Sequence, residues 1–290
     1  MDEGHARIPG PKISGTTRVA GIIGWPVEHS LSPTIHNAAF AVLGLDWVYV
    51  PLPVRPSEVA DAFAGLGRLG IAGANVTMPH KAAAADASTT LSDDAARLHA
   101  VNTLVVDGDE LLGHNTDAPG FERFLRADAA FDPSGRHALI LGAGGVARAC
   151  ALALARGGVA SITIAARDPV RAETALRAVV DGFGTDIHGV AFDGAVRVEA
   201  ELVVNATPLG ARDDPPPAPA VGAGAVVVDL LTHPTVTHLQ TSARSRGATA
   251  FGGLGLLLHQ AALSFELWTG QQPLLEVMSA AALGALADRD

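Results

Sequence analysis

A short apolar run at residues 137–141 leads directly into a glycine-rich turn and then into a helical stretch. The turn is Gly142-Ala143-Gly144-Gly145-Val146-Ala147, which has the spacing G-x-G-x-x-A. Gly142 permits a tight turn, Gly144 lets a pyrophosphate approach the backbone, and Ala147 allows close packing of helix on strand. Because the amino end of a helix attracts phosphate, this turn predicts a dinucleotide-binding site. A glycine loop with a purely structural use is the alternative.

The next predicted strand indicates which dinucleotide binds. It ends near Ala166, where a site for NAD usually carries an acidic residue that holds the ribose 2′-hydroxyl. Arg167 follows at once and Arg171 lies four residues further on, and two guanidinium groups suit the 2′-phosphate of NADP. Two surface arginines near Glu173 are the alternative. We therefore predict NADP, and the charge of Asp168 leaves open how strictly NAD is excluded.

Apolar runs of strand length alternate with Ala- and Leu-rich stretches of helical length through the whole chain. That alternation predicts an α/β fold built on mainly parallel sheets. A turn-rich segment at 128–135 separates two such series, and 290 residues suffice for two domains. We expect strands at 18–24, 47–52, 73–77, 100–106, 138–141, 161–165, 202–205 and 226–229, helices at 33–43, 56–69, 86–99, 255–268 and 273–287, and a hairpin turn at 107–109.

Composition excludes several classes of protein. Apolar residues make up 48% of the chain and charged residues 17%, so a large core can form, and the single cysteine, Cys150, excludes an internal disulfide framework. A net charge of −10 argues against nucleic acid and anionic membranes as partners. No run approaches the ~18 apolar residues of a membrane span, and the first residues lack an apolar signal segment. We expect a cytoplasmic protein with a small-molecule substrate.

Polar side chains at predicted element ends mark a second site in the first half of the chain. Ser30 and Ser32 precede a helix that starts near Pro33, where hydroxyl groups can hold a carboxylate, although Ser32 is equally suited to be the N-cap. Lys81 falls in the first turn of another predicted helix, where the dipole disfavours a cation by about 0.3–1 kcal/mol. That placement suggests a role in proton transfer, and Asp117 could set the protonation and orientation of the lysine.

Seven segments, taken in order along the chain, resemble the shikimate dehydrogenase family. The resemblance implies a substrate domain at 1–117 and 254–290 and a Rossmann domain for NADP at 118–253, with a cleft between them. It also implies the reduction of 3-dehydroshikimate to shikimate in aromatic amino-acid (chorismate) biosynthesis. The segments are 24–37, 75–81, 101–103, 115–120, 142–149, 205–210 and 253–270.

The resemblance also assigns roles to single residues. Lys81 and Asp117 are expected to form the catalytic pair, and Ser30 and Ser32 to bind the substrate carboxylate. Four further residues are expected to hydrogen-bond the ring hydroxyls or to position that pair: Asn75, Thr77, Asn102 and Gln260. Besides the glycine turn, the residues expected beside the cofactor are Asn205, Thr207, Leu230, Gly253 and Leu256, the last at a place where the family often has Met.

One departure from the family bears on substrate choice. Thr232 stands two residues before Pro234, where the family usually has tyrosine. A quinate/shikimate or amino-shikimate dehydrogenase with broader substrate or cofactor use is therefore the close alternative. A non-catalytic NADP-binding or regulatory protein on the same scaffold is the alternative of a different class. The chain is expected to be a monomer or a homodimer.

Overall fold

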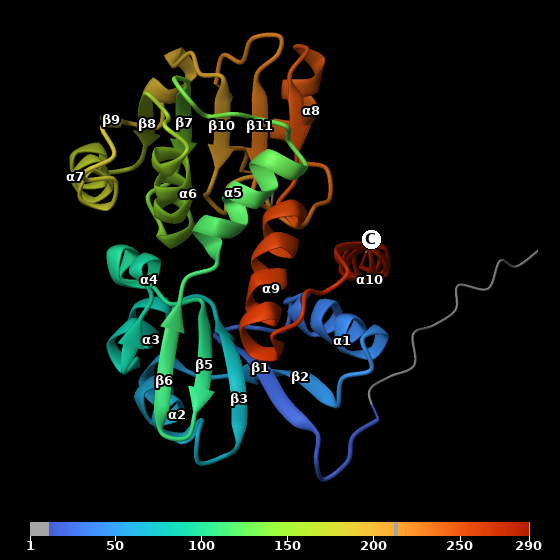
Figure 1. The fold of residues 1–290 in the computed structure, drawn as a ribbon. Helices are drawn as coiled ribbons and strands as arrows, with labels where there is room; N and C mark the ends of the chain where they lie inside the picture. The colour runs from blue at the N-terminus through green and yellow to red at the C-terminus, as the bar shows by residue number, and fades with distance from the viewer. Residues whose placement is uncertain (1–11, 212–213, 218, 290) are drawn as a thin grey trace, which may run out of the picture. The chain divides into compact units, whose positions relative to one another are not determined.

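The computed structural model describes residues 12–211, 214–217 and 219–289, and it divides into two compact units (Figure 1). Unit 1 consists of two segments of the chain, one that ends at Thr116 and one that starts at Ala261, and unit 2 runs from Asp117 to Gln260. The second border lies inside helix α9 (Leu254–Thr269), so one continuous helix supplies residues to both units. Residues 1–11 of the predicted first domain lie outside the described residues.

Unit 1 is built on a six-stranded mixed sheet in the order β2-β1-β3-β5-β6-β4. The first three strands of that order are parallel, and β5 runs antiparallel to both β3 and β6. The predicted hairpin is confirmed, since Asp107 pairs with Glu110 and Gly108 adopts a φ of 60°. The strands are β1 (Arg18–Gly24), β2 (Trp47–Pro53), β3 (Ile71–Val76), β4 (Thr90–Leu91), β5 (Thr103–Asp107) and β6 (Glu110–His114).

The helix predicted at 86–99 is wrong. That segment instead holds the short strand β4 followed by a separate helix, α4 (Asp93–Leu98). The β-branched Thr89 and Thr90 favour extended backbone, and the Ser92 hydroxyl accepts from the Ala95 amide at 3.3 Å, which starts the helix anew. The other helical elements of unit 1 are α1 (Ser32–Val42), η1 (Pro56–Glu58), α2 (Val59–Gly65), α3 (Lys81–Ala87) and α10 (Leu275–Ala287).

Unit 2 contains a six-stranded sheet in the order β12-β11-β10-β7-β8-β9, in which all neighbouring strands are parallel. The chain starts in the centre at β7, builds outward through β8 and β9, and then returns to the other side of β7 with β10. That reversal creates a switch point, where the carboxyl ends of parallel strands bind ligands. The strands are β7 (His137–Leu141), β8 (Ser161–Ala165), β9 (Asp186–Val190), β10 (Leu202–Asn205), β11 (Val226–Asp229) and β12 (Thr249–Phe251).

Two helices of unit 2 approach each other at glycine residues. A Cβ on Gly120 would lie 2.9 Å from the backbone nitrogen of Gln260, and one on Gly255 would lie 2.4 Å from the Phe124 ring. Helix α5 (Asp117–Ala127) and α9 therefore pack backbone to backbone (Figure 1). The other helices are α6 (Gly145–Arg156), α7 (Pro169–Val179), η2 (Gly194–Arg197) and α8 (His238–Ser245). Within the described ranges, no helix is long and apolar enough to cross a bilayer.

Candidate active site

Strand pairing in unit 1 brings four of the predicted segments to one edge of the sheet. Asn75 lies opposite Thr103, and Thr103 lies opposite His114. The Val76 amide donates to the Asn102 carbonyl at 2.8 Å, and the Asn102 amide donates to the His114 carbonyl at 3.0 Å. The segments at 75–81, 101–103 and 115–116 are therefore neighbours. Gly24 joins them from β1, since a Cβ there would lie 2.4 Å from the methyl carbon of Thr77.

The two serines lie at the amino end of α1, but Ser32 is not its N-cap. The helix begins at Ser32 itself, and the capping residue, Leu31, makes no side-chain cap. The Ser30 hydroxyl instead accepts from the Ser32 amide at 3.2 Å. Capping thus does not explain why Ser32 carries a hydroxyl, and its role in holding a carboxylate stays a prediction.

Buried amide and hydroxyl groups form a continuous network behind this edge. The Tyr49 hydroxyl donates to Asn75 Oδ1 at 2.7 Å, and Asn75 Nδ2 donates to Ser264 Oγ at 3.0 Å. Asn102 Oδ1 accepts from the Thr116 amide at 2.7 Å. Four members of this network had no role assigned from the sequence: Tyr49, Thr103, Thr116 and Ser264. The last three lie inside the segments 101–103, 115–120 and 253–270, whereas Tyr49 lies outside all seven segments and is distinguished only as the one tyrosine of the chain.

Lys81 is the first residue of α3, as predicted. His80 precedes the helix, and its Nε2 lies 2.7 Å from the Val54 carbonyl, while the Lys81 carbonyl accepts from the Val101 amide at 2.9 Å. The backbone around the lysine is thus tied to two other segments of unit 1. Lys81 is also one of only two lysines in a chain with 20 basic residues. Its partner role with Asp117 stays a prediction.

Asp117 and Gln260 belong to the same unit and are placed by the contact of α5 with α9. Asp117 opens α5, one turn before Gly120, whose Cα faces the backbone of Gln260. Both side chains are buried, and Gln260 Nε2 donates to the Leu257 carbonyl at 2.8 Å. A side chain on Gly120 would separate the two helices, and with them these two polar residues.

The glycine turn of unit 2 lies at the carboxyl end of β7, beside β10. Gly142 has a φ of 100°, and a Cβ on it would lie 2.8 Å from the Thr207 methyl group. A Cβ on Gly144 or Gly145 would meet no atom within 4 Å. The turn is thus tight where it touches β10 and open where α6 begins, as a pyrophosphate requires.

A buried carboxylate holds the neighbouring loops. Asp229, at the end of β11, accepts from Asn205 Nδ2 at 2.9 Å and from the Thr237 hydroxyl at 2.6 Å. Burial raises the pKa of Asp229, and these hydrogen bonds oppose that shift. Asn205 Oδ1 in turn accepts from the Thr207 hydroxyl at 2.6 Å. The sequence analysis missed Asp229, which looked like an ordinary strand end.

The other residues expected beside the cofactor surround the start of α9. A Cβ on Gly253 would lie 2.2 Å from the Leu230 carbonyl oxygen, and the Gly253 amide donates to the Leu231 carbonyl at 2.9 Å. Leu230 is half-buried, and Leu256 is buried on α9. The loop after β11 is therefore held against the loop that precedes α9, and both belong to unit 2.

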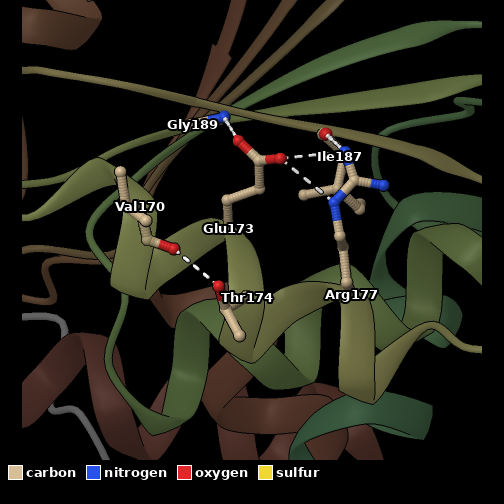
Figure 2. Close-up of polar contacts among 6 residues, drawn as sticks. All are labelled: Val170, Glu173, Thr174, Arg177, Ile187 and Gly189. Atoms are coloured by element: carbon tan, nitrogen blue, oxygen red, sulfur yellow. Dashed lines mark hydrogen bonds and ion pairs between the residues drawn. The ribbon is translucent and has the colours of Figure 1, made fainter.

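The two arginines after β8, Arg167 and Arg171, are exposed, and neither is the ion-pair partner of Glu173. Glu173 instead accepts from the Gly189 amide at 2.8 Å and from Arg177 Nε at 3.0 Å (Figure 2), and these contacts lower its pKa. Within the described part of the chain, neither Arg167 nor Arg171 forms an ion pair.

The Asp168 carboxylate, whose negative charge would repel a phosphate, has a structural role. Asp168 caps α7 by accepting from the Arg171 amide at 3.0 Å. Its charge is thus directed at backbone donors of the helix. The open glycine turn and two exposed guanidinium groups fit NADP.

Comparison with known proteins gives consistent matches. A model of the shikimate dehydrogenase substrate-binding domain matches residues 22–104, and one of the shikimate 5'-dehydrogenase C-terminal domain matches residues 253–283. The NADP(+) shikimate dehydrogenase of Geobacter metallireducens is 42% identical over 282 residues, which are 94% of this chain and 99% of that protein.

Solved structures extend the comparison to the fold. A shikimate dehydrogenase in complex with NADP+ superposes with a TM-score of 0.87 at 35% identity, over 96% of this chain and 98% of that one. The Thermus thermophilus enzyme with NADP(H) and shikimate gives 0.82 at 36%, over 93% and 100%. A 5-ketofructose reductase of Gluconobacter sp. strain CHM43 gives 0.85 at 31%, over 94% and 100%. Similarity of fold therefore extends to proteins named for a different substrate.

Proposed function

The chain belongs to the shikimate dehydrogenase family, and on that premise we propose that it catalyses the reversible, NADPH-dependent reduction of 3-dehydroshikimate to shikimate. The observation that carries the proposal is the match to NADP(+) shikimate dehydrogenases at about 40% identity over nearly the full length of both chains. Such an enzyme is an oxidoreductase acting on a CH–OH group. We assign substrate binding to unit 1 with the later part of α9, and NADP binding to unit 2.

The chemistry divides between cofactor and protein. NADPH, when bound, supplies the hydride. Lys81 donates a proton to the carbonyl oxygen during reduction and accepts it in the reverse direction, and Asp117 orients the ammonium group. Ser30 and Ser32 bind the substrate carboxylate. Thr77, Asn102 and Gln260 bind the ring hydroxyls, so that the ring is held in one orientation.

Residues of unit 2 are proposed to hold the cofactor without touching the reacting bond. Gly142, Gly144 and the amino end of α6 receive the pyrophosphate, because the backbone is open there. Arg167 and Arg171 bind the 2′-phosphate, which a guanidinium can grip with two hydrogen bonds. The loops at 205–210 and 230–237, joined through Asp229, border the remaining part of the cofactor.

Thr232 favours one alternative, an enzyme with broader substrate use. It is half-buried in the loop that follows β11, and threonine lacks the ring of the tyrosine that the family usually has there. A quinate dehydrogenase from Corynebacterium glutamicum crystallised with NAD has the same fold, with a TM-score of 0.83 at 30% identity over 92% of this chain and 99% of that one. The fold therefore accommodates either specificity.

Steady-state oxidation of shikimate and of quinate, each with NADP and with NAD, tests the proposal. We expect shikimate with NADP to give the highest kcat/KM. Comparable turnover of quinate would assign the chain to the broader enzymes and make Thr232→Tyr the first variant to examine. No turnover of any of the four pairs, together with tight NADP binding, would favour a non-catalytic NADP-binding protein. A cytoplasmic location is part of the same proposal.

A further inference from the structure

The polar network of unit 1 begins at a buried phenol. Tyr49 is 1% exposed, and its hydroxyl lies 2.7 Å from Asn75 Oδ1. The ring stacks on His36 with centroids 4.5 Å apart, so the position of the hydroxyl is fixed by packing. Burial raises the pKa of Tyr49 well above its ordinary value, and a hydrogen bond with the Ser32 side chain opposes that shift only in part, so the phenol keeps its proton. Asn75 Oδ1 is thus held from this side by a phenol whose ring is fixed by packing.

That donor fixes which way the Asn75 amide faces. With Oδ1 toward Tyr49, Nδ2 points to acceptors on three other elements: the Asn102 carbonyl at 3.1 Å, Thr103 Oγ1 at 3.2 Å and Ser264 Oγ at 3.0 Å. Two amide hydrogens thus face three protein acceptors, and the amide has no spare donor for a ligand. The structure favours Asn75 as a residue that positions others over one that contacts the substrate.

The network ends at Thr116, one residue before Asp117 in the chain. The Thr103 hydroxyl donates to Asn102 Oδ1 at 3.1 Å, and Asn102 holds Thr116 through the Thr116 amide at 2.7 Å and its hydroxyl at 2.9 Å. Hydrogen bonds in a buried network strengthen and orient one another. Loss of the Tyr49 hydroxyl should therefore alter the geometry at Asn102 and Thr116.

We propose that Tyr49 is a positioning residue of the dehydrogenase, acting through Asn75 and Thr103 to fix the Asn102 side chain and the backbone that leads into Asp117. Thr103 and Ser264 are further members of the same relay. The inference rests on the proposed function, because its readout is turnover of the substrate. It goes beyond that function by assigning a positioning role to side chains that the proposed function does not use.

Tyr49→Phe is the primary test, since it removes one hydroxyl and keeps the ring that stacks on His36. We expect kcat with shikimate to fall about tenfold or more, as small misplacements of reacting groups cause, and the pH profile of kcat to shift, while the KM for NADP stays unchanged. Phe40→Leu is the matched control: it removes ring contacts with Trp47 and Phe265 in the same cluster and no hydrogen bond of the network. It should lower the melting temperature without changing kcat per folded molecule.

Thr103→Val and Thr103→Ser form a second pair at a fully buried position. Valine keeps the shape and loses the hydroxyl, and should reproduce the loss of Tyr49→Phe; serine keeps the hydroxyl and should restore most of kcat. The proposal is overturned if Tyr49→Phe retains kcat within twofold of wild type, or if Phe40→Leu shows the same loss and the same shift. Absence of shikimate turnover in the wild type would instead contradict the proposed function, so the two failures are distinguishable.

Discussion

The two units build their proposed binding sites from different parts of the polypeptide. In unit 1 the site is backed by the buried side chains of Tyr49, Asn75 and Asn102; the Tyr49 hydroxyl donates to Asn75 Oδ1, and Asn75 Nδ2 donates to the backbone carbonyl of Asn102. In unit 2 it is a backbone surface, with an open turn at Gly144 and the amino end of α6. A ring with several hydroxyls needs donors and acceptors at set positions, whereas a pyrophosphate needs amide groups and space. Substitutions in unit 1 should therefore reduce turnover or stability, and those in unit 2 cofactor affinity.

The largest effect is expected at Lys81. Lys81→Ala should lower kcat by roughly 10²–10⁴-fold, because acid–base help is lost, and should leave NADP affinity unchanged, as measured by fluorescence titration. Lys12→Ala, at the only other lysine, is the control and should behave as wild type. If Lys81→Ala turns over shikimate at the wild-type rate, Lys81 has no part in proton transfer.

His36 should make unit 1 sensitive to acid. Burial lowers its pKa from 6.5 to about 3, and interaction with the Asn75 side chain opposes that shift only in part. Below pH 6.5 the unfolded chain binds a proton there and the folded chain does not, so the free energy of unfolding falls as pH falls. Between pH 7 and pH 5 the loss is about 2 kcal/mol.

Urea unfolding at both pH values measures this loss. His36→Phe retains a ring and removes the titration, so its stability should change less between pH 7 and pH 5. His29→Phe, at an exposed position in the same segment, should retain the wild-type dependence. An unchanged dependence in His36→Phe would show that the acid sensitivity arises elsewhere.

Substitutions at Gly144 and Gly142 distinguish an effect on cofactor binding from an effect on the stability of unit 2. Gly144→Val places a side chain where the protein has no atom within 4 Å, so the fold should persist while NADP affinity falls at least about tenfold. Gly142→Ala is strained by a φ of 100° and by contact with Thr207, and should lower the melting temperature. Equal NADP affinity in Gly144→Val and wild type would exclude the pyrophosphate from this turn.

The smallest effect is expected at the arginines, because they are exposed. Arg167→Ala should reduce the preference for NADP over NAD severalfold by weakening contact with the 2′-phosphate. Arg177→Ala is the matched control on the adjacent helix; its guanidinium is bound to Glu173 and to the Ile187 carbonyl (Figure 2), so the ratio of the two kcat/KM values should not change. Loss of preference in the control alone would assign the 2′-phosphate to Arg177, in the last turn of α7.

Strands with a strong apolar pattern were predicted correctly, and strands with a weak apolar pattern were not. The strands β8, β10 and β11 have the predicted bounds, because a buried parallel strand is a nearly continuous apolar run. The edge strands β9 and β12 were not anticipated, since Gly189 and Thr249 interrupt short runs with little apolar character. The helix expected at 86–99 was wrong because the prediction gave more weight to alanine content than to the β-branched Thr89 and Thr90, the second of which begins β4.

The sequence by itself determined the α/β class, the glycine turn at Gly142 and the family, because each rests on residues adjacent in the chain. Tertiary structure alone decided that Tyr49 and Ser264 meet at Asn75 and that Asp229 joins two loops of unit 2. These partners come from separate elements, and Asn75 and Ser264 are 189 residues apart. A hydrogen bond across such a distance depends on strand register and helix packing, which no local pattern encodes.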